Sequence, residues 1–128
     1  MAVVTYSTEY SGRGIRVILW DALANGDTGS PYTVPANWSD RSVQVQGTFG
    51  VGGSVALQGS NNVSTPSYGV LHKADGVTDA NITDNEPVQL LENTMIVRPN
   101  VTAGDGTTSV AVRLSISTIT RRKRVLTK

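Results

Sequence analysis

The sequence predicts an all-β, single-domain antiparallel β-sandwich, and three observations lead to this prediction. Among the 128 residues, valine (17), threonine (15) and serine (12) outnumber leucine (8) and isoleucine (6), and β-branched residues favour strands. No segment carries a sustained apolar stripe with the i, i+3, i+4, i+7 spacing of an amphipathic helix. Short alternating segments instead follow one another, separated by glycine, proline and asparagine. Jelly-roll and immunoglobulin-like topologies both fit this pattern.

We divide the chain into an N-terminal arm (residues 1–14), a β-sandwich domain (15–120) and a basic C-terminal tail (121–128), so that both termini extend from one domain. The first segment is polar, with Gly12 and Gly14 near its end. It fits an extended arm or a loosely held first strand.

The first strands of the domain follow from apolar runs and turn residues. Residues 15–20 (IRVILW) predict a strongly apolar strand, and Asn25-Gly26 predicts a tight turn within 21–29. Residues 32–35 predict a short edge strand, because prolines at 31 and 35 limit it. Residues 37–40 are expected to form a loop.

The clearest period of two lies in residues 41–60, RSVQVQGTFGVGGSVALQGS. Val43 and Val45 share one face with the glutamines on the other, and Val55 and Leu57 repeat the pattern after a glycine-rich turn. We therefore predict a half-buried antiparallel hairpin. The turn lacks the lysine-containing ending of a phosphate-binding loop, so its glycines are expected to serve positive-φ turn positions.

The remaining elements are shorter until the last strand. Loops are expected at 59–66 and 72–85, the latter being the least structured part of the middle. Weak or short strands are expected at 68–71, 87–91 and 95–101, the last of them interrupted by Pro99. Residues 109–119 predict the cleanest strand, and its apolar face is formed by Val110, Val112, Leu114 and Ile116. The total is seven or eight short strands.

Charge is segregated along the chain. Residues 1–120 hold six basic and ten acidic side chains, a net charge of −4, whereas the last eight positions hold five basic ones. These are Arg121, Arg122, Lys123, Arg124 and Lys128. Such a tail can dock on an acidic protein neighbour, stay solvated or bind phosphates. Nucleic acid is the least favoured partner, because no aromatic residues are interleaved for stacking on bases.

Residues that carry chemistry are few. The absence of cysteine excludes disulfides and thiolate sites, and the only histidine, His72, is expected to be a solvated loop residue rather than a base beside a nucleophile. The acidic residues at 75, 79, 84 and 86 suggest glycosidic or calcium chemistry, but they lack EF-hand spacing and better fit a solvated loop. We predict no enzyme activity, no catalytic residue, no cofactor and no metal site.

The two tryptophans, the apolar stretches and the N-terminus also bear on possible partners. Trp20 ends an apolar strand and is expected in the core, whereas Trp38 lies in a polar loop. Trp38 could serve as a platform for a sugar or lie at a subunit contact. No apolar stretch is long enough to cross a bilayer, and the N-terminus lacks the pattern of a signal peptide. No membrane partner is therefore expected.

The segment DRSVQVQGTFGVGGSVALQGSNN (residues 40–62), followed by Arg98-Pro99 and Val101, resembles small virion proteins of phages. The resemblance covers roughly residues 40–115. It points to the capsid decoration (cement) proteins of tailed phages, which are small β-sandwich or jelly-roll proteins without catalytic residues.

The resemblance implies a non-enzymatic structural protein that decorates and cements the outer capsid by bridging subunits of the major capsid protein. It would assemble in the host cytoplasm, reside on the outer capsid surface of the virion and form a homo-oligomer, a dimer or trimer. We expect the interface to include Val3, Val4, Tyr6, Tyr10, Trp38, Arg121, Arg122, Lys123, Arg124 and Lys128. The alternative is a carbohydrate-binding virion or tail module that uses Trp38 and residues 72–86.

Overall fold

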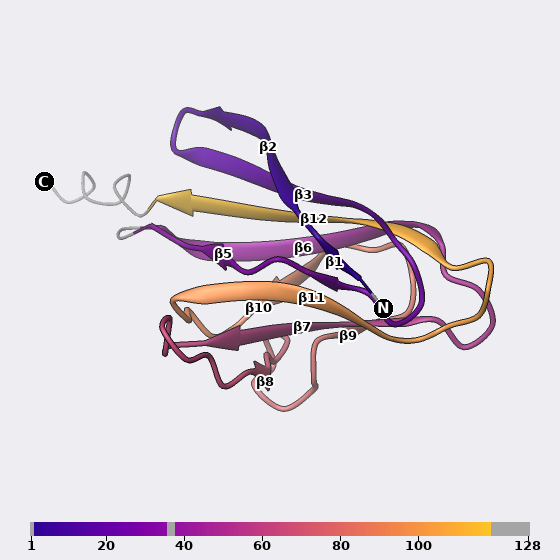
Figure 1. Ribbon diagram of the computed structural model, residues 1–128. Helices are drawn as coiled ribbons and strands as arrows, with labels where there is room; N and C mark the ends of the chain where they lie inside the picture. Colours follow the sequence, from indigo (N-terminus) through magenta and orange to yellow (C-terminus); the bar gives the residue numbers. More distant parts are fainter. Residues whose placement is uncertain (1, 36–37, 119–128) are drawn as a thin grey trace, which may run out of the picture.

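A computed structural model describes residues 2–35 and 38–118 of the chain. Two β-sheets pack face to face (Figure 1), and no helix occurs in the described ranges. The predicted all-β sandwich is therefore confirmed. One pairing departs from the prediction: β1 (Val3–Val4) and β4 (Thr28–Gly29) pair in parallel, whereas the other strand pairs are antiparallel.

The five-stranded sheet has the order β10-β6-β12-β3-β2. Its strands are β10 (Val88–Leu90), β6 (Trp38–Thr48), β12 (Ser109–Thr118), β3 (Ile15–Leu23) and β2 (Tyr6–Gly12). The apolar face predicted for the last strand is confirmed, since Val110, Val112, Leu114 and Ile116 are all buried. This strand occupies the centre of the sheet, with β6 on one side and β3 on the other.

The seven-stranded sheet has the main order β1-β4-β11-β7-β8. The strands not yet defined are β11 (Ile96–Ala103), β7 (Ser54–Ser60), β8 (Gly69–Val70), β5 (Tyr32–Thr33) and β9 (Asn81–Ile82). The last two lie off this path, with β5 beside β11 and β9 beside β7. Only β7 and β11 are long, so they carry most of this sheet's share of the core.

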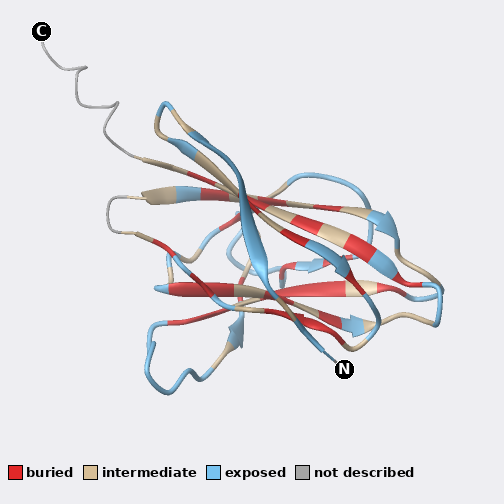
Figure 2. Ribbon diagram, turned by 45° about the horizontal axis from the view of Figure 1, so that its top comes forward, coloured by how far each residue is buried: buried red, intermediate tan, exposed pale blue. Residues whose placement is uncertain are grey.

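The core fills the space between the sheets. Trp20 is fully buried, as expected, and its indole Nε1–H donates to the Ser30 carbonyl over 2.8 Å. Gly29 lies against this ring, since a Cβ there would come within 2.5 Å of Trp20 and 2.6 Å of Pro99. In Figure 2 the buried positions alternate along strands of both layers. Burying one of the valine, leucine or isoleucine side chains at these positions stabilises the fold by about 1.5–3 kcal/mol.

The predicted hairpin over residues 41–60 is wrong. Both of its arms are strands, but β6 belongs to the five-stranded sheet and β7 to the seven-stranded one. The glycine-rich turn, with positive φ at Gly50 and Gly52, carries the chain from one sheet to the other. An alternating pattern shows which side chains face the core, but it does not show which strands pair. Two strands in facing sheets give the same pattern as two strands of one hairpin.

A hairpin does form where the sequence suggested an arm. The strands β2 and β3 pair through Arg13-Gly14, and both turn residues have positive φ, 54° and 76°. This backbone geometry is that of a type I′ turn, which matches the twist of the flanking strands. Residues 3–12 therefore lie on the sandwich as β1 and β2, in line with the loosely held first strand that was one of the two expectations.

Pro99 does not interrupt its strand, contrary to the prediction. The strand β11 continues through it, with Pro99 opposite Leu57. On the other edge, the Val101 N–H donates to the Asp27 carbonyl over 2.9 Å, so the nitrogen of residue 99 faces that same edge. Pro99 lies there between the short strands β5 and β4. The missing N–H therefore falls where the neighbouring strand is broken.

The segment 72–85 is more ordered than predicted. Ala80 and Ile82 are buried in the core, and β9 pairs with β7. The Asp75 carboxylate closes a turn by accepting hydrogen bonds from the backbone N–H groups of Val77 and Thr78. Polar composition concealed this order because only two apolar positions reach the core, and hydrogen bonds within the segment and to β7 provide the rest.

Candidate protein-docking surface

The strand β2 is the longest edge strand in the described structure. The other strands at the ends of the two sheet orders have two or three residues, whereas β2 has seven. Its sequence, YSTEYSG, contains neither lysine nor proline, and all of it except Gly12 is exposed (Figure 2). Natural proteins usually shorten, charge or cover such edges because they can pair with a strand from another chain.

An ion pair holds this edge strand to the sheet. Arg113 on β12 donates from Nε and Nη2 to the two carboxylate oxygens of Glu9, over 2.7 and 3.1 Å, and from Nη1 to Gln46 on β6 over 2.7 Å. These hydrogen bonds lower the pKa of Glu9 and raise that of Arg113. Because Glu9 sits at the irregularity between Thr8 and Tyr10, the bidentate contact fixes the strand where its pairing is weakest.

The predicted N-terminal contact residues divide into two pairs. Val3 and Tyr10 are open to solvent, with 65% and 49% of their surface exposed. Tyr6 is 40% exposed but packs edge-on against Trp20 and Tyr32, and Val4 packs against the core. The open pair could contact a partner directly, whereas Val4 and Tyr6 also hold the N-terminal strands on the sandwich.

The strand register aligns one row of residues across all five strands of this sheet. Gln89 pairs with Ser42, Ser42 with Ser115, Ser115 with Val17, and Val17 with Tyr10. The row lies on the side of the sheet away from the core, because none of its members is buried. The row is therefore polar on β10, β6 and β12, and it becomes apolar and aromatic on β3 and on the edge strand β2.

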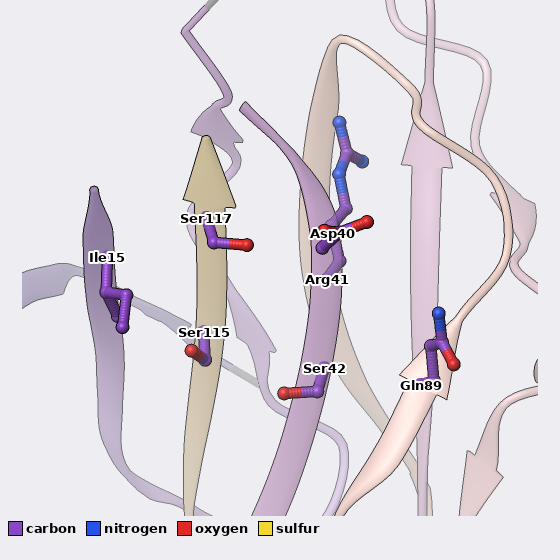
Figure 3. A pocket seen from close by; sticks show the side chains of 7 residues that line it. All are labelled: Ile15, Asp40, Arg41, Ser42, Gln89, Ser115 and Ser117. Carbon is purple, nitrogen blue, oxygen red and sulfur yellow. The ribbon is translucent and has the colours of Figure 1, made fainter. Parts of the chain in front are cut away.

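A shallow recess of about 320 Å³ lies on this outer face. In Figure 3, Ser115 lies beside Ser42 on the neighbouring strand, and Ser117 lies further along the same strand as Ser115. The other lining residues are Ile15, Asp40, Arg41 and Gln89. The lining offers hydroxyl groups and an amide but no imidazole to act as their base. These groups, together with the Asp40 carboxylate, can form hydrogen bonds with a partner surface.

Trp38 does not lie in a loop, contrary to the prediction. It begins β6, is half-buried and packs against the core. The Arg16 guanidinium lies 4.8 Å from the centre of its ring, a cation–π distance. The arginine therefore covers part of one face of the ring, where a sugar would otherwise stack.

His72 is tied into a cluster of carboxylates, which corrects the expectation of a solvated loop histidine. Its Nδ1 lies 2.5 Å from Glu92 Oε2, its backbone N–H donates to Glu92 Oε1 over 2.7 Å, and its Nε2 lies 3.5 Å from Asp79. The hydrogen bond to Glu92, with further attraction from nearby carboxylates, raises the pKa of His72. Both ring nitrogens are engaged, so the histidine links two segments of the chain.

The four acidic residues at 75–86 do not converge. Asp75 is engaged in its own turn, where the Thr78 hydroxyl and two backbone N–H groups lower its pKa to about 2. Asp79 faces His72 instead. Within residues 2–35 and 38–118, no group of three histidine or acidic side chains is arranged to hold a metal ion.

Sequence reasoning missed Arg41, a buried residue of which only 3% is exposed. Its guanidinium donates to the Thr94 carbonyl over 2.7 Å and to the Glu92 carbonyl over 3.4 Å. A signal was present in the sequence. Arg41 lies two and four positions before the inward-facing Val43 and Val45, and a strand places such residues on the same face. Residue type alone favours a solvated position, because arginine is rarely fully buried.

The basic tail lies outside the described residues, so the contacts predicted for Arg121, Arg122, Lys123, Arg124 and Lys128 stay predictions. In the part of the chain that the structure describes, no helix has the length and apolar character needed to span a membrane.

Comparisons with protein-family models, curated proteins and solved structures found no match to this chain. The resemblance to capsid decoration proteins therefore stays a prediction from the residues that carry it.

Proposed function

We propose that this protein is a non-enzymatic structural protein of a tailed-phage virion. It decorates and cements the outer capsid by bridging subunits of the major capsid protein. The resemblance of residues 40–115 to decoration proteins supports the virion role. The observation that supports docking is the long exposed edge of β2, which lies beside the outer face of the five-stranded sheet.

This edge can bind a partner by strand addition. Its outward backbone N–H and C=O groups can pair with an extended segment of a capsid subunit, and the adjoining row from Gln89 to Tyr10 can contact side chains of that subunit. Main-chain pairing would supply affinity, whereas the change from polar to apolar groups along the row would supply specificity.

Cementing follows from mass action. A protein that binds across neighbouring subunits only in the mature lattice stabilises that lattice by its binding free energy. A homo-oligomer could contact several subunits at once, which raises the effective concentration of each further contact. Modest individual contacts, repeated over the shell, would then oppose its disruption.

The direct test is to mix the purified protein with bare expanded heads of the phage that encodes it. We expect saturable binding and a rise in the melting temperature of the capsid. Absence of binding at saturating protein would contradict the proposal. A truncation that removes residues 121–128, compared at low and high salt, tests the tail separately: unchanged occupancy would exclude the tail from the contact.

A pair of lysine substitutions tests the edge. Ser7→Lys places a positive charge on the exposed β2, and we expect head binding to weaken by about tenfold or more, since edge lysines oppose strand addition. Val77→Lys is the control, because it adds the same charge at an 81% exposed residue between β8 and β9, two strands that belong to the other sheet. Equal binding by both variants would exclude the β2 edge.

A further inference from the structure

Two buried polar atoms on β6 have no hydrogen-bond partner. They are Ser39 Oγ and Arg41 Nε, and no other buried side-chain nitrogen or oxygen in the described residues shares this property. They belong to residues two apart in the sequence, beside the irregularity where Arg41 pairs with Ile116 and Trp38 with Thr118. Because buried polar groups are nearly always hydrogen-bonded, two such atoms so close in the chain point to a bound group that accepts hydrogen bonds.

The charge of Arg41 leads to the same conclusion. Its two described hydrogen bonds go to neutral main-chain carbonyls, of Glu92 and Thr94. None of the ion pairs among the described residues includes it, and its burial lowers its pKa. A buried guanidinium without a counter-charge destabilises a fold, so an anion that reaches it would bind with a gain in electrostatic energy.

A groove gives access to this region. It has a volume of about 220 Å³ and is lined by Arg41 together with Val34, Pro35, Trp38, Asn93, Thr94 and Met95. Pockets that bury drug-sized ligands measure about 300–1,000 Å³, so this groove admits a single side chain or a small acid. Its walls are mainly apolar and aromatic, which strengthens any charge interaction inside it.

A second arginine increases the positive potential. Arg16 donates from Nη1 to the Tyr32 hydroxyl over 3.0 Å and lies over the ring of Trp38, a groove residue. Arg16, like Arg41, takes part in none of the described ion pairs. We call this end of the sandwich, which holds Arg16 and Arg41, the arginine end.

We propose that the groove at the arginine end binds a carboxylate group, with Arg41 Nε and Ser39 Oγ as its hydrogen-bond donors. Arg41 lines the groove, whereas Ser39 is not a lining residue itself but stands in the sequence between two of them, Trp38 and Arg41. Each outer guanidinium nitrogen of Arg41 already donates to a carbonyl, so the donor atoms without any partner are Arg41 Nε and Ser39 Oγ. Two unpartnered donor atoms match the two oxygens of a carboxylate. The carboxylate can come from an acidic side chain of a partner polypeptide or from a small free acid.

This site is independent of the proposed capsid role. It lies beside β6, where that strand begins, whereas the docking edge is β2 on the far side of β12 and β3. If the protein did not bind heads, the proposal of a carboxylate site would be unaffected. If the groove did not bind a carboxylate, the proposal of docking through the β2 edge would be unaffected.

The test follows the Nε–H resonance of Arg41 by NMR during titration with sodium acetate, with sodium chloride at equal ionic strength as reference. We expect a saturable shift with acetate and little change with chloride. The Nε–H of Arg98 is an internal control, since it donates to Gln58 over 2.9 Å and should not move. No shift with acetate, or the same shift with both salts, would overturn the proposal and assign the two atoms to ordered water.

Two variants identify the donors. Ser39→Ala should weaken acetate binding about tenfold, as expected for the loss of one hydrogen bond to a charged group. Arg41→Lys keeps the charge but removes Nε, and should abolish the saturable response seen in the spectrum of the groove residues. The backbone spectrum reports whether each variant is folded; should Arg41→Lys unfold, Ser39→Ala alone decides, and unchanged affinity in it would refute the assigned donors.

A further arm distinguishes the two sources. The capped tripeptide acetyl-Ala-Glu-Ala-amide is compared with its Gln counterpart and with acetate. Tighter binding of the Glu peptide than of acetate assigns the groove to an acidic side chain of a partner polypeptide. Equal or weaker binding assigns it to a small free acid, and binding of the Gln peptide as strong as that of the Glu peptide contradicts carboxylate recognition.

Discussion

The two ends of the sandwich use their polar groups differently. At one end, which we call the aspartate end, two carboxylates close turns. Asp27 accepts hydrogen bonds from the N–H groups of Ala2 and Ala24, each over 2.9 Å. Asp105 accepts from the N–H groups of Val51 and Thr107, also over 2.9 Å. Each carboxylate thus joins segments that would otherwise separate.

The arginine end contains buried donors that the described chain does not satisfy, Ser39 Oγ and Arg41 Nε. Groups matched inside the protein stabilise the fold, whereas unmatched ones reduce its stability and remain for a partner. The comparison indicates that the aspartate end holds the fold together and the arginine end is suited to binding. Four substitutions test this difference, beginning with the one expected to have the largest effect.

Asp27→Ala should reduce the free energy of unfolding by about 3 kcal/mol, because it leaves two backbone N–H groups without their charged acceptor. Urea denaturation measures the change. Asp27→Asn, which keeps one carbonyl oxygen as an acceptor, should lose roughly half as much. A loss below about 1 kcal/mol for the alanine variant would show that this end does not depend on its carboxylate.

Thr108→Val tests a neutral group at the same end. The Thr108 hydroxyl donates to the Phe49 carbonyl over 2.8 Å and accepts from the Asp105 N–H over 2.9 Å. Valine has nearly the same shape but makes neither bond, so unfolding should become easier by about 2 kcal/mol. The urea midpoint measures it, and an unchanged midpoint would contradict the assigned role of this threonine.

His72→Gln tests a link to the arginine end, since Glu92 holds His72 with its carboxylate and Arg41 with its carbonyl. The pKa of His72 is raised in the folded protein. Its protonation therefore stabilises the fold below the unfolded pKa of about 6.5, and this contribution is lost as pH rises through the folded pKa. Urea midpoints of the wild type should fall between about pH 5.5 and pH 8, and the variant should show a flatter profile.

A wild-type profile as flat as that of His72→Gln would show that the histidine does not stabilise the link. The comparison must be made at constant ionic strength, because the groups are partly exposed and salt weakens their attraction.

Ser39→Ala should have the smallest effect on stability, within about 0.5 kcal/mol of the wild type or slightly stabilising, because it removes a buried hydroxyl without a partner. Ser60→Ala is the control at a serine whose side-chain oxygen has partners within the protein. Ser60 Oγ accepts from the N–H groups of Asn62 and Ser67, so its loss should cost about 1–2 kcal/mol. A similar loss in both variants would show that Ser39 has a partner within the protein.

The sequence alone determined the strand content and the inward faces. The alternation in residues 109–119 and 41–60 identified Val43, Val45, Val112 and Leu114 as core residues, because a strand presents every second side chain to the same side. The Asn25-Gly26 turn was also predictable from local preference, since Gly26 has a φ of 88°.

Only the tertiary structure decided which strands pair and which polar groups are buried. The arms of the 41–60 segment lie in opposite sheets, and Arg41 lies under the loop that contains Glu92 and Thr94. The two hydrogen bonds that hold the buried Arg41 join residues 51 and 53 positions apart in the sequence. Local patterns specify the face that a residue presents to the core, but its neighbours across the core come from the whole fold.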